Sequence, residues 1–334
     1  MTLQAIDVHT HILPRTWPDQ RARTGYGGWV RLAHEAHGQS RMLIDEREFR
    51  VVESDLWDAG RRLEDMDRTG VGVQVLSTVP VMFAYWAPAN DALVLARLLN
   101  DDIAATVRLR PDRFTGLGTV PLQDPELAIA ELERCVGQLG LAGIQIASHV
   151  GTRDLDDAML FPVLQRAAEL GAAVFVHPWD MLGAERMARY WLPWLVGMPT
   201  ECSLAICAVI LGGVLERLPA LRIGFAHGGG SFVGTFGRIE RGFEARPDLV
   251  AVSNPVPPRA YLGRFWVDAL VHDPQVLRLV VDMFGADRVA LGTDYPFPLG
   301  ESVPGSTIDA MPELTAGIRA SLRNGAARSF LGLA

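Results

Sequence analysis

Residues 5 to 11 read Ala-Ile-Asp-Val-His-Thr-His, a short apolar run that ends in two histidines one residue apart. Alternate residues of a β-strand share a face, so His9 and His11 are expected to point the same way. Two imidazoles at the end of one strand can bind the same metal ion, although His-x-His is a short pattern that also arises by chance. The stretch predicts a strand whose carboxyl end carries part of a metal site.

Three later apolar runs end in the same fashion, each with a histidine or an aspartate. They are AVFVH at 173–177, IGFAH at 223–227 and VALGTD at 289–294. In a (β/α)8 barrel the catalytic groups lie at the C-terminal ends of the strands. Runs that all end in metal-binding residue types therefore predict a barrel with its active site at that end.

Strand-like and helix-like segments alternate about eight times along the chain, with helical periodicity at 92–109, 125–139 and 160–170. Such alternation is typical of a parallel sheet covered by helices, and eight repeats favour closure into a barrel. We therefore predict an α/β fold, a (β/α)8 TIM barrel of the metal-dependent hydrolase type. The expected strands are 6–9, 73–76, 114–120, 143–146, 173–177, 222–227, 265–268 and 289–294.

The barrel is expected to form one domain over residues 1–334, with two segments that interrupt its pattern. Residues 12 to about 60 show little periodicity and predict an irregular lid inserted after the first strand. Pro178 to Pro199 is rich in Trp and Met and would also overhang the site.

The net charge of −8 without any basic tract argues against a nucleic-acid or membrane partner and favours a small molecule. Three scattered cysteines indicate reduced thiols, and the amino-terminal residues lack the pattern of a secretory signal. The most apolar helical run, Leu204–Leu215, is shorter than the ~20 residues that span a bilayer. We expect a cytoplasmic protein in which this run is a buried helix.

The chain contains no lysine, and all 31 basic residues are arginine. A GC-rich genome would by itself account for this bias. The absence nevertheless excludes Schiff-base chemistry on a lysine and phosphate binding by a P-loop lysine. It also excludes a carbamylated lysine that bridges two metal ions, so the predicted site is mononuclear.

The candidate metal ligands are His9, His11, His177 and Asp294. Catalytic zinc takes three or four such ligands and keeps one position open for water. We therefore expect one Zn²⁺ per chain, with Co²⁺ or Fe²⁺ as possible substitutes and no organic cofactor. Asp7 is expected to point away from the histidine pair and to be structural.

His227 ends the sixth expected strand and precedes Gly228-Gly229-Gly230-Ser231. A histidine beside a metal-bound water could accept its proton, because imidazole titrates near neutral pH. The alternatives are a fifth metal ligand or a histidine packed between loop and barrel. The glycine run could also bind phosphate, but it lacks the lysine and the spacing of a P-loop.

The chain resembles the amidohydrolase superfamily, and within it the decarboxylases of aminocarboxymuconate semialdehyde. The resemblance runs nearly from end to end and rests on nine motifs taken together. They are DVHTH (7–11), FR (49–50), LWD (56–58), PVMF (80–83), VPLQD (120–124), HPWDM (177–181), LPWLV (192–196), HGGGSF (227–232) and DYPFPLG (294–300).

The resemblance implies a role for each matching residue. It implies the same four zinc ligands, and His227 as the residue that activates the metal-bound water. Arg50 would bind a substrate carboxylate, while Arg238 and Arg246 would reach the substrate of the partner subunit in a homodimer. From the residues alone, a solvated helix face is the preferred interpretation of this arginine pair. Trp194 and Met181, together with Trp191, would form an apolar wall or else pack in the core.

The implied reaction is zinc-dependent, oxygen-independent decarboxylation of a small dicarboxylate in tryptophan or nitrobenzoate breakdown. Residues 20–47 depart from the family pattern, so the exact substrate is less secure than the reaction class. One alternative is a sister decarboxylase of a hydroxybenzoate-like acid, although such relatives commonly have Glu in place of His9. Others are a metal-dependent hydrolase or hydratase acting on a ring or enol acid, and a binding protein without activity.

Overall fold

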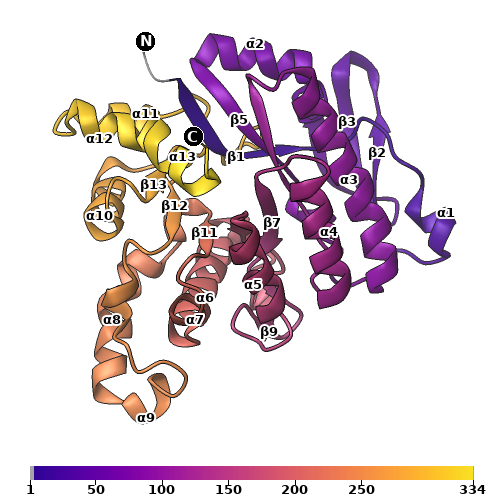
Figure 1. The fold of residues 1–334 in the computed structure, drawn as a ribbon. Coiled ribbons are helices and arrows are strands. Elements are labelled where there is room, and N and C mark those ends of the chain that lie inside the picture. Colours follow the sequence, from indigo (N-terminus) through magenta and orange to yellow (C-terminus); the bar gives the residue numbers. More distant parts are fainter. Residues whose placement is uncertain (1–3, 334) are drawn as a thin grey trace.

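The computed structural model describes residues 4–333, and in it eight parallel strands form a closed barrel (Figure 1). Hydrogen bonds join the first and last strands, from Val8 N to Leu291 O (2.9 Å) and from Asp294 N to His9 O (2.8 Å). The predicted TIM barrel is confirmed. In spatial order its strands are β1 (Ala5–Ile12), β5 (Val71–Thr78), β6 (Phe114–Gly118), β7 (Gly143–Ala147), β10 (Ala173–His177), β11 (Arg222–Phe225), β12 (Trp266–Asp268) and β13 (Val289–Ala290).

Helices cover the outside of the barrel and bury apolar side chains against the strands. Several begin at an aspartate whose carboxylate accepts backbone N–H groups, as Asp58, Asp124 and Asp273 do. The main helices are α2 (Ala59–Thr69), α3 (Ala89–Leu109), α4 (Pro125–Gly137), α5 (Phe161–Leu170), α6 (Met198–Leu211), α8 (Phe232–Ala245), α10 (Pro274–Phe284) and α13 (Ala326–Leu331). Shorter helices are α7 (Val214–Arg217), α9 (Pro247–Val250), α11 (Ser306–Asp309) and α12 (Ala316–Ala320).

All eight predicted strands are present, but three of them end earlier than expected, and one of these is β6, which stops at Gly118. β11 stops at Phe225 and β13 at Ala290, so His227 and Asp294 lie in the loops that follow. Both residues have a left-handed backbone, with φ of 57° and 58°. Such non-glycine conformations cost about 1–3 kcal/mol each and concentrate at functional sites. Left-handed residues cannot continue a strand, so neither β11 nor β13 extends to these residues.

The inserted segment is more regular than its sequence indicates. After the short helix α1 (Gln20–Thr24), it forms an antiparallel sheet of β2 (Val30–His34), β3 (Gln39–Ile44) and β4 (Arg47–Glu53). The expectation of an irregular lid was therefore wrong. Its strands are short, and buried and exposed residues do not alternate strictly along them. Met42 and Val52 are buried against the loop that follows β5. Packing against the barrel, not local pattern, stabilises this sheet.

The second overhanging segment contains the turn η4 (Ala184–Arg186) and a π-helical turn η5 (Pro193–Gly197) that continues into α6. The resulting helix, Pro193–Leu211, has 19 residues and a mean hydropathy of 1.7, which meets the length and composition of a membrane span. The apolar helix is thus longer than the run predicted from sequence. Half of it is buried inside the fold, as in a core helix.

Candidate metal centre

Four side chains from three parts of the barrel meet at the C-terminal ends of its strands. His9 and His11 come from β1, His177 from the end of β10, and Asp294 from the loop after β13. Their four donor atoms all lie within 4.8 Å of one another, and all four residues are buried. Asp294 Oδ1 lies 2.9 Å from His11 Nε2 and 3.4 Å from His9 Nε2.

The opposite nitrogen of each imidazole already has a hydrogen-bond partner. Nδ1 of His11 lies 2.9 Å from Thr78 O, and Nδ1 of His177 lies 3.0 Å from Pro178 O. Since a carbonyl can only accept, these nitrogens carry the proton and leave an Nε2 lone pair facing Asp294. His177 Nε2 is buried and has no hydrogen-bond partner within residues 4–333. Lone pairs that converge on a carboxylate need a cation, so the donor set fits a divalent metal.

The protonation states agree with that fit. Burial lowers the pKa of His11 and lowers that of His177 well below its usual range, so both are neutral ligands. Burial would raise the pKa of Asp294, but the rings of His11, His227 and His9 hold it well below its usual range. Neutral imidazoles and an ionised carboxylate are the forms in which these side chains bind a metal.

Asp268, at the end of β12, orients two parts of the site, and the sequence analysis missed it. Its Oδ2 lies 2.7 Å from His9 Nδ1 and accepts the backbone N–H of His227 at 2.9 Å. Its Oδ1 accepts the N–H groups of Gly228 (2.8 Å) and Leu270 (3.1 Å). The carboxylate is fully buried, so it fixes the tautomer of a ligand and the conformation of the His227 loop. Its place at the end of a strand was the one available signal.

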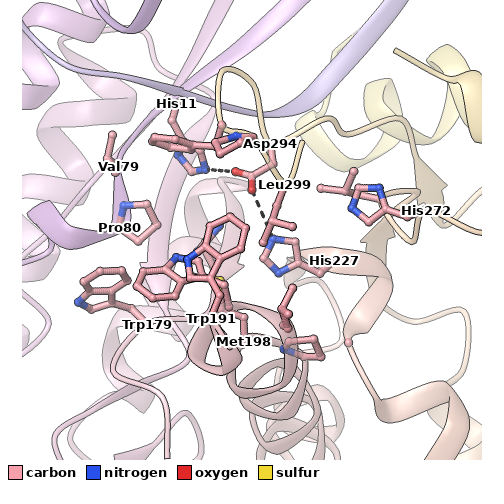
Figure 2. A pocket seen from close by; sticks show the side chains of 18 of the residues that line it. His11, Val79, Pro80, Trp179, Trp191, Met198, His227, His272, Asp294 and Leu299 are labelled. Atoms are coloured by element: carbon pink, nitrogen blue, oxygen red, sulfur yellow. Dashed lines mark ion pairs between the residues drawn. The ribbon is translucent and has the colours of Figure 1, made fainter. Parts of the chain in front are cut away.

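His227 lies on the other side of the Asp294 carboxylate from His11 (Figure 2). Figure 2 shows His11 and His227 flanking the Asp294 carboxylate; His227 Nε2 lies 3.9 Å from Asp294 Oδ2. Burial disfavours the charged ring, but Asp294 and the Cys202 thiol together raise the pKa of His227 to about 10. A divalent cation held by Asp294 would repel the imidazolium and favour the neutral ring, the form that a general base requires.

Two further residues support the ligands from behind. Asp7 accepts the N–H and hydroxyl of Thr293, next to Asp294, and is not one of the converging donors, so it is structural as expected. Arg62 is fully buried in α2 and donates to the carbonyl of His11 at 2.7 Å. No spacing pattern in the sequence marks Arg62.

A cavity of about 280 Å³ opens beside the metal ligands and is lined mostly by apolar and aromatic side chains. The partly buried Arg50, from β4, faces it with its guanidinium 4.6 Å from the Phe297 ring centre and 5.8 Å from that of Trp194. No carboxylate lies within ion-pair distance of Arg50 in the described chain, and burial lowers its pKa. An arginine without an acidic partner beside a cavity is suited to bind a carboxylate ligand.

The remaining predicted binding residues divide between the cavity and the surface. Trp194 and Trp191 line the cavity, whereas Met181 is not among the lining residues and lies against Gly197. Arg238 and Arg246, on and just after α8, lie outside the cavity of their own chain. Arg246 is exposed and paired with Asp248 at 2.6 Å.

The amidohydrolase family model matches residues 6–333. The chain belongs to the amidohydrolase family. It is 55% identical over 328 residues to a 2-amino-3-carboxymuconate-6-semialdehyde decarboxylase of Dictyostelium discoideum, covering 98% of this chain and 91% of the relative. The decarboxylase of the same name from Caenorhabditis elegans is 38% identical over 367 residues, with coverages of 95% and 91%. The similarity to these relatives shows that the chain is a carboxy-lyase.

Solved structures agree with this placement. The 5-carboxyvanillate decarboxylase of Sphingomonas paucimobilis superposes with a TM-score of 0.82 at 25% identity, covering 99% of this chain and all of that one. The enzyme of that name from Novosphingobium aromaticivorans has a TM-score of 0.74 at 26% identity, with coverages of 83% and 81%, and was crystallised with manganese. A divalent metal and a small anionic ligand are therefore supported for this site.

Proposed function

We propose that this enzyme is zinc-dependent and removes carbon dioxide from 2-amino-3-carboxymuconate 6-semialdehyde, giving 2-aminomuconate 6-semialdehyde, without oxygen. The observation that carries the proposal is the unpaired Arg50 beside the converging donors of His9, His11, His177 and Asp294. The two full-length relatives that bear this activity in their names support the choice of substrate.

The chain's own residues can carry out the required steps. Arg50 binds a substrate carboxylate through two parallel N–H donors, and the aromatic rings around it exclude water and strengthen that contact. A bound zinc ion would lower the pKa of a coordinated water towards ~7 and so supply a nucleophile at neutral pH. His227 would accept a proton at Nε2 and return it to the substrate carbon that carries the departing carboxylate, so that a C–H bond replaces the broken C–C bond.

We further propose a cytoplasmic homodimer in which Arg238 and Arg246 reach the neighbouring subunit's substrate. The exposed position of both arginines, outside their own cavity, is compatible with contact to a second chain. In Figure 1, α8 and α9 project at the lower left beyond the barrel, which makes them accessible to such a partner.

The deciding experiment is an assay of purified, metal-analysed enzyme with freshly generated substrate, following the loss of its absorbance together with carbon dioxide release. Rapid decay that needs about one zinc per chain is expected. The Arg50→Ala variant should lose about 10- to 100-fold in kcat/KM, since a charge-assisted hydrogen bond is worth about 1.5–3 kcal/mol. Arg50→Lys keeps the charge without the two parallel donors and serves as the matched control.

Two results would overturn the proposal. A zinc-replete enzyme that leaves this substrate unchanged but decarboxylates a hydroxybenzoate would move it to the aromatic-acid branch. Consumption of substrate without release of carbon dioxide would indicate hydrolysis or hydration instead.

A further inference from the structure

His272 lies in the loop after β12 and lines the same cavity as Arg50. Six ionisable side chains line that cavity: His11, Arg50, His177, His227, His272 and Asp294. Three of them are metal-ligand candidates, and His227 is the proposed base. Arg50 and His272 are therefore the two ionisable groups that the same chain has left to bind a substrate.

The turn that holds His272 does not depend on its imidazole. Asp273 accepts the N–H groups of Gln275 (2.8 Å) and Val276 (3.0 Å), and Pro274 begins α10. The ring of His272 makes no hydrogen bond or ion pair to any other residue in the described part of the chain, and it is exposed. Its neighbours alone therefore explain the local structure.

His272 nevertheless has a strained backbone, with φ of 59°. Glycine adopts this conformation without strain and asparagine tolerates it well. Nine non-glycine residues between 4 and 333 have positive φ, and four of them line the cavity: Trp191, His227, His272 and Asp294. Strained residues persist where the site requires their side chains.

The loop is held firmly next to the proposed base. A Cβ atom added to Gly228 would lie 2.3 Å from Val271 Cγ1, so the loop packs directly against the backbone beside His227. Leu270, two residues before His272, donates to Asp268 at 3.1 Å. In Figure 2, His272 lies beyond His227 as seen from Trp179. Arg50, from strand β4 of the inserted sheet, instead lies against the ring of Phe297. The two groups thus approach the cavity from different walls.

We propose that His272 is a specificity-determining residue that donates a hydrogen bond to the second carboxylate of a substrate whose first carboxylate binds Arg50. The substrate class is then an unsaturated acid with two carboxylates on adjacent carbons. This inference rests on the proposed function, because it assigns the second anionic group of that substrate.

The test measures ligand binding to the zinc-loaded protein by calorimetry, with phthalate and benzoate as probes. Phthalate has two carboxylates on adjacent sp² carbons, and benzoate has one. The His272→Phe variant should lose about 10- to 100-fold in phthalate affinity and change benzoate affinity by less than about threefold. His272→Gly should show the same selective loss while keeping the thermal stability of the wild type, since glycine relieves the positive φ.

Val276→Ala is the matched control, because Val276 lines the same cavity, is exposed and offers no hydrogen bond. It should shift both affinities by the same factor. Equal losses for both ligands in His272→Phe would overturn the inference, as would a wild type that binds phthalate no better than benzoate. This outcome is independent of turnover: an enzyme inactive on the muconate semialdehyde contradicts the proposed function, while the binding ratio still decides the role of His272.

Discussion

At the scale of single residues, the metal centre depends on where three protons lie. The Nδ1–H groups of His11 and His177 donate hydrogen bonds to backbone carbonyls, and the Nδ1–H of His9 donates to the carboxylate of Asp268. Each imidazole therefore presents a lone pair to the same point in space. The chemistry of the site follows from these contacts as much as from the identity of the ligands.

Asp268→Asn should release the metal although it changes only one atom. Whichever way the amide turns, its NH2 faces two N–H donors, and in the orientation that faces His9 this imidazole would have to move its proton to Nε2. We expect a 10- to 100-fold loss of zinc affinity, about the usual effect of removing such a partner, in competition with a chelator. Asp273→Asn, which also binds two backbone N–H groups but caps α10, should keep its zinc. Unchanged zinc affinity in Asp268→Asn would disprove the tautomer argument.

His227→Ala and Asp294→Ala should separate base from ligand. The first should retain zinc but lose about 10²- to 10⁴-fold in turnover, the usual contribution of a general base. The second should lose zinc and activity together, because it removes the only carboxylate among the converging donors. Metal analysis alongside kcat measures both effects, and loss of zinc from His227→Ala would make His227 a ligand.

At the scale of elements, one carboxylate joins three segments around the second overhanging loop. Glu201 of α6 lies 3.2 Å from Nδ1 of His149, in the short strand β8 (His149–Val150), and accepts the backbone N–H of Leu182 at 2.7 Å. The negative charges of Asp180 and Asp154 also help to raise the pKa of His149. The segment that follows His177 is thereby held down on the barrel.

The stability from this contact should depend on pH. The hydrogen bond to Glu201 raises the pKa of His149 above 6.5, so its contribution is complete below that value and is lost as pH rises. Burial opposes ionisation of Glu201, but His149 and neighbouring N–H groups keep its pKa below 4.5. We expect Glu201→Gln to cost about 1–2 kcal/mol near pH 5.5 and less at pH 9, measured by urea unfolding. Asp282→Asn, in the exposed pair with Arg278, should show no such trend.

At the scale of the whole molecule, the question is whether a second chain completes the site. If Arg246 acts in trans, refolding a mixture of the two inactive variants His227→Ala and Arg246→Ala should restore activity. Half of the dimers would be hybrid with one intact site each, which predicts about a quarter of wild-type activity by statistics of a two-fold dimer. His227→Ala mixed with Asp294→Ala should stay inactive, because both defects affect the same subunit's site. Absence of recovery in the first mixture would confine Arg246 to its own chain.

The sequence by itself determined the barrel and the residue types at its strand ends. Apolar runs that alternate with helical periods are local patterns, and a terminal His or Asp on each run can be read without knowing its neighbours. His9, His11, His177 and Asp294 do converge in the structure. The inserted sheet was missed because its short strands depend on packing against the barrel.

Only the tertiary structure decided which side chains support or leave the site. Asp268 and His272 are distant in sequence from the metal ligands, whereas Met181 follows a ligand by four positions yet is not among the residues that line the cavity. The physical reason is that hydrogen bonds and cavity walls form between loops whose course local patterns do not specify. Burial then sets the charge state of each group, and burial exists only once the chain has folded.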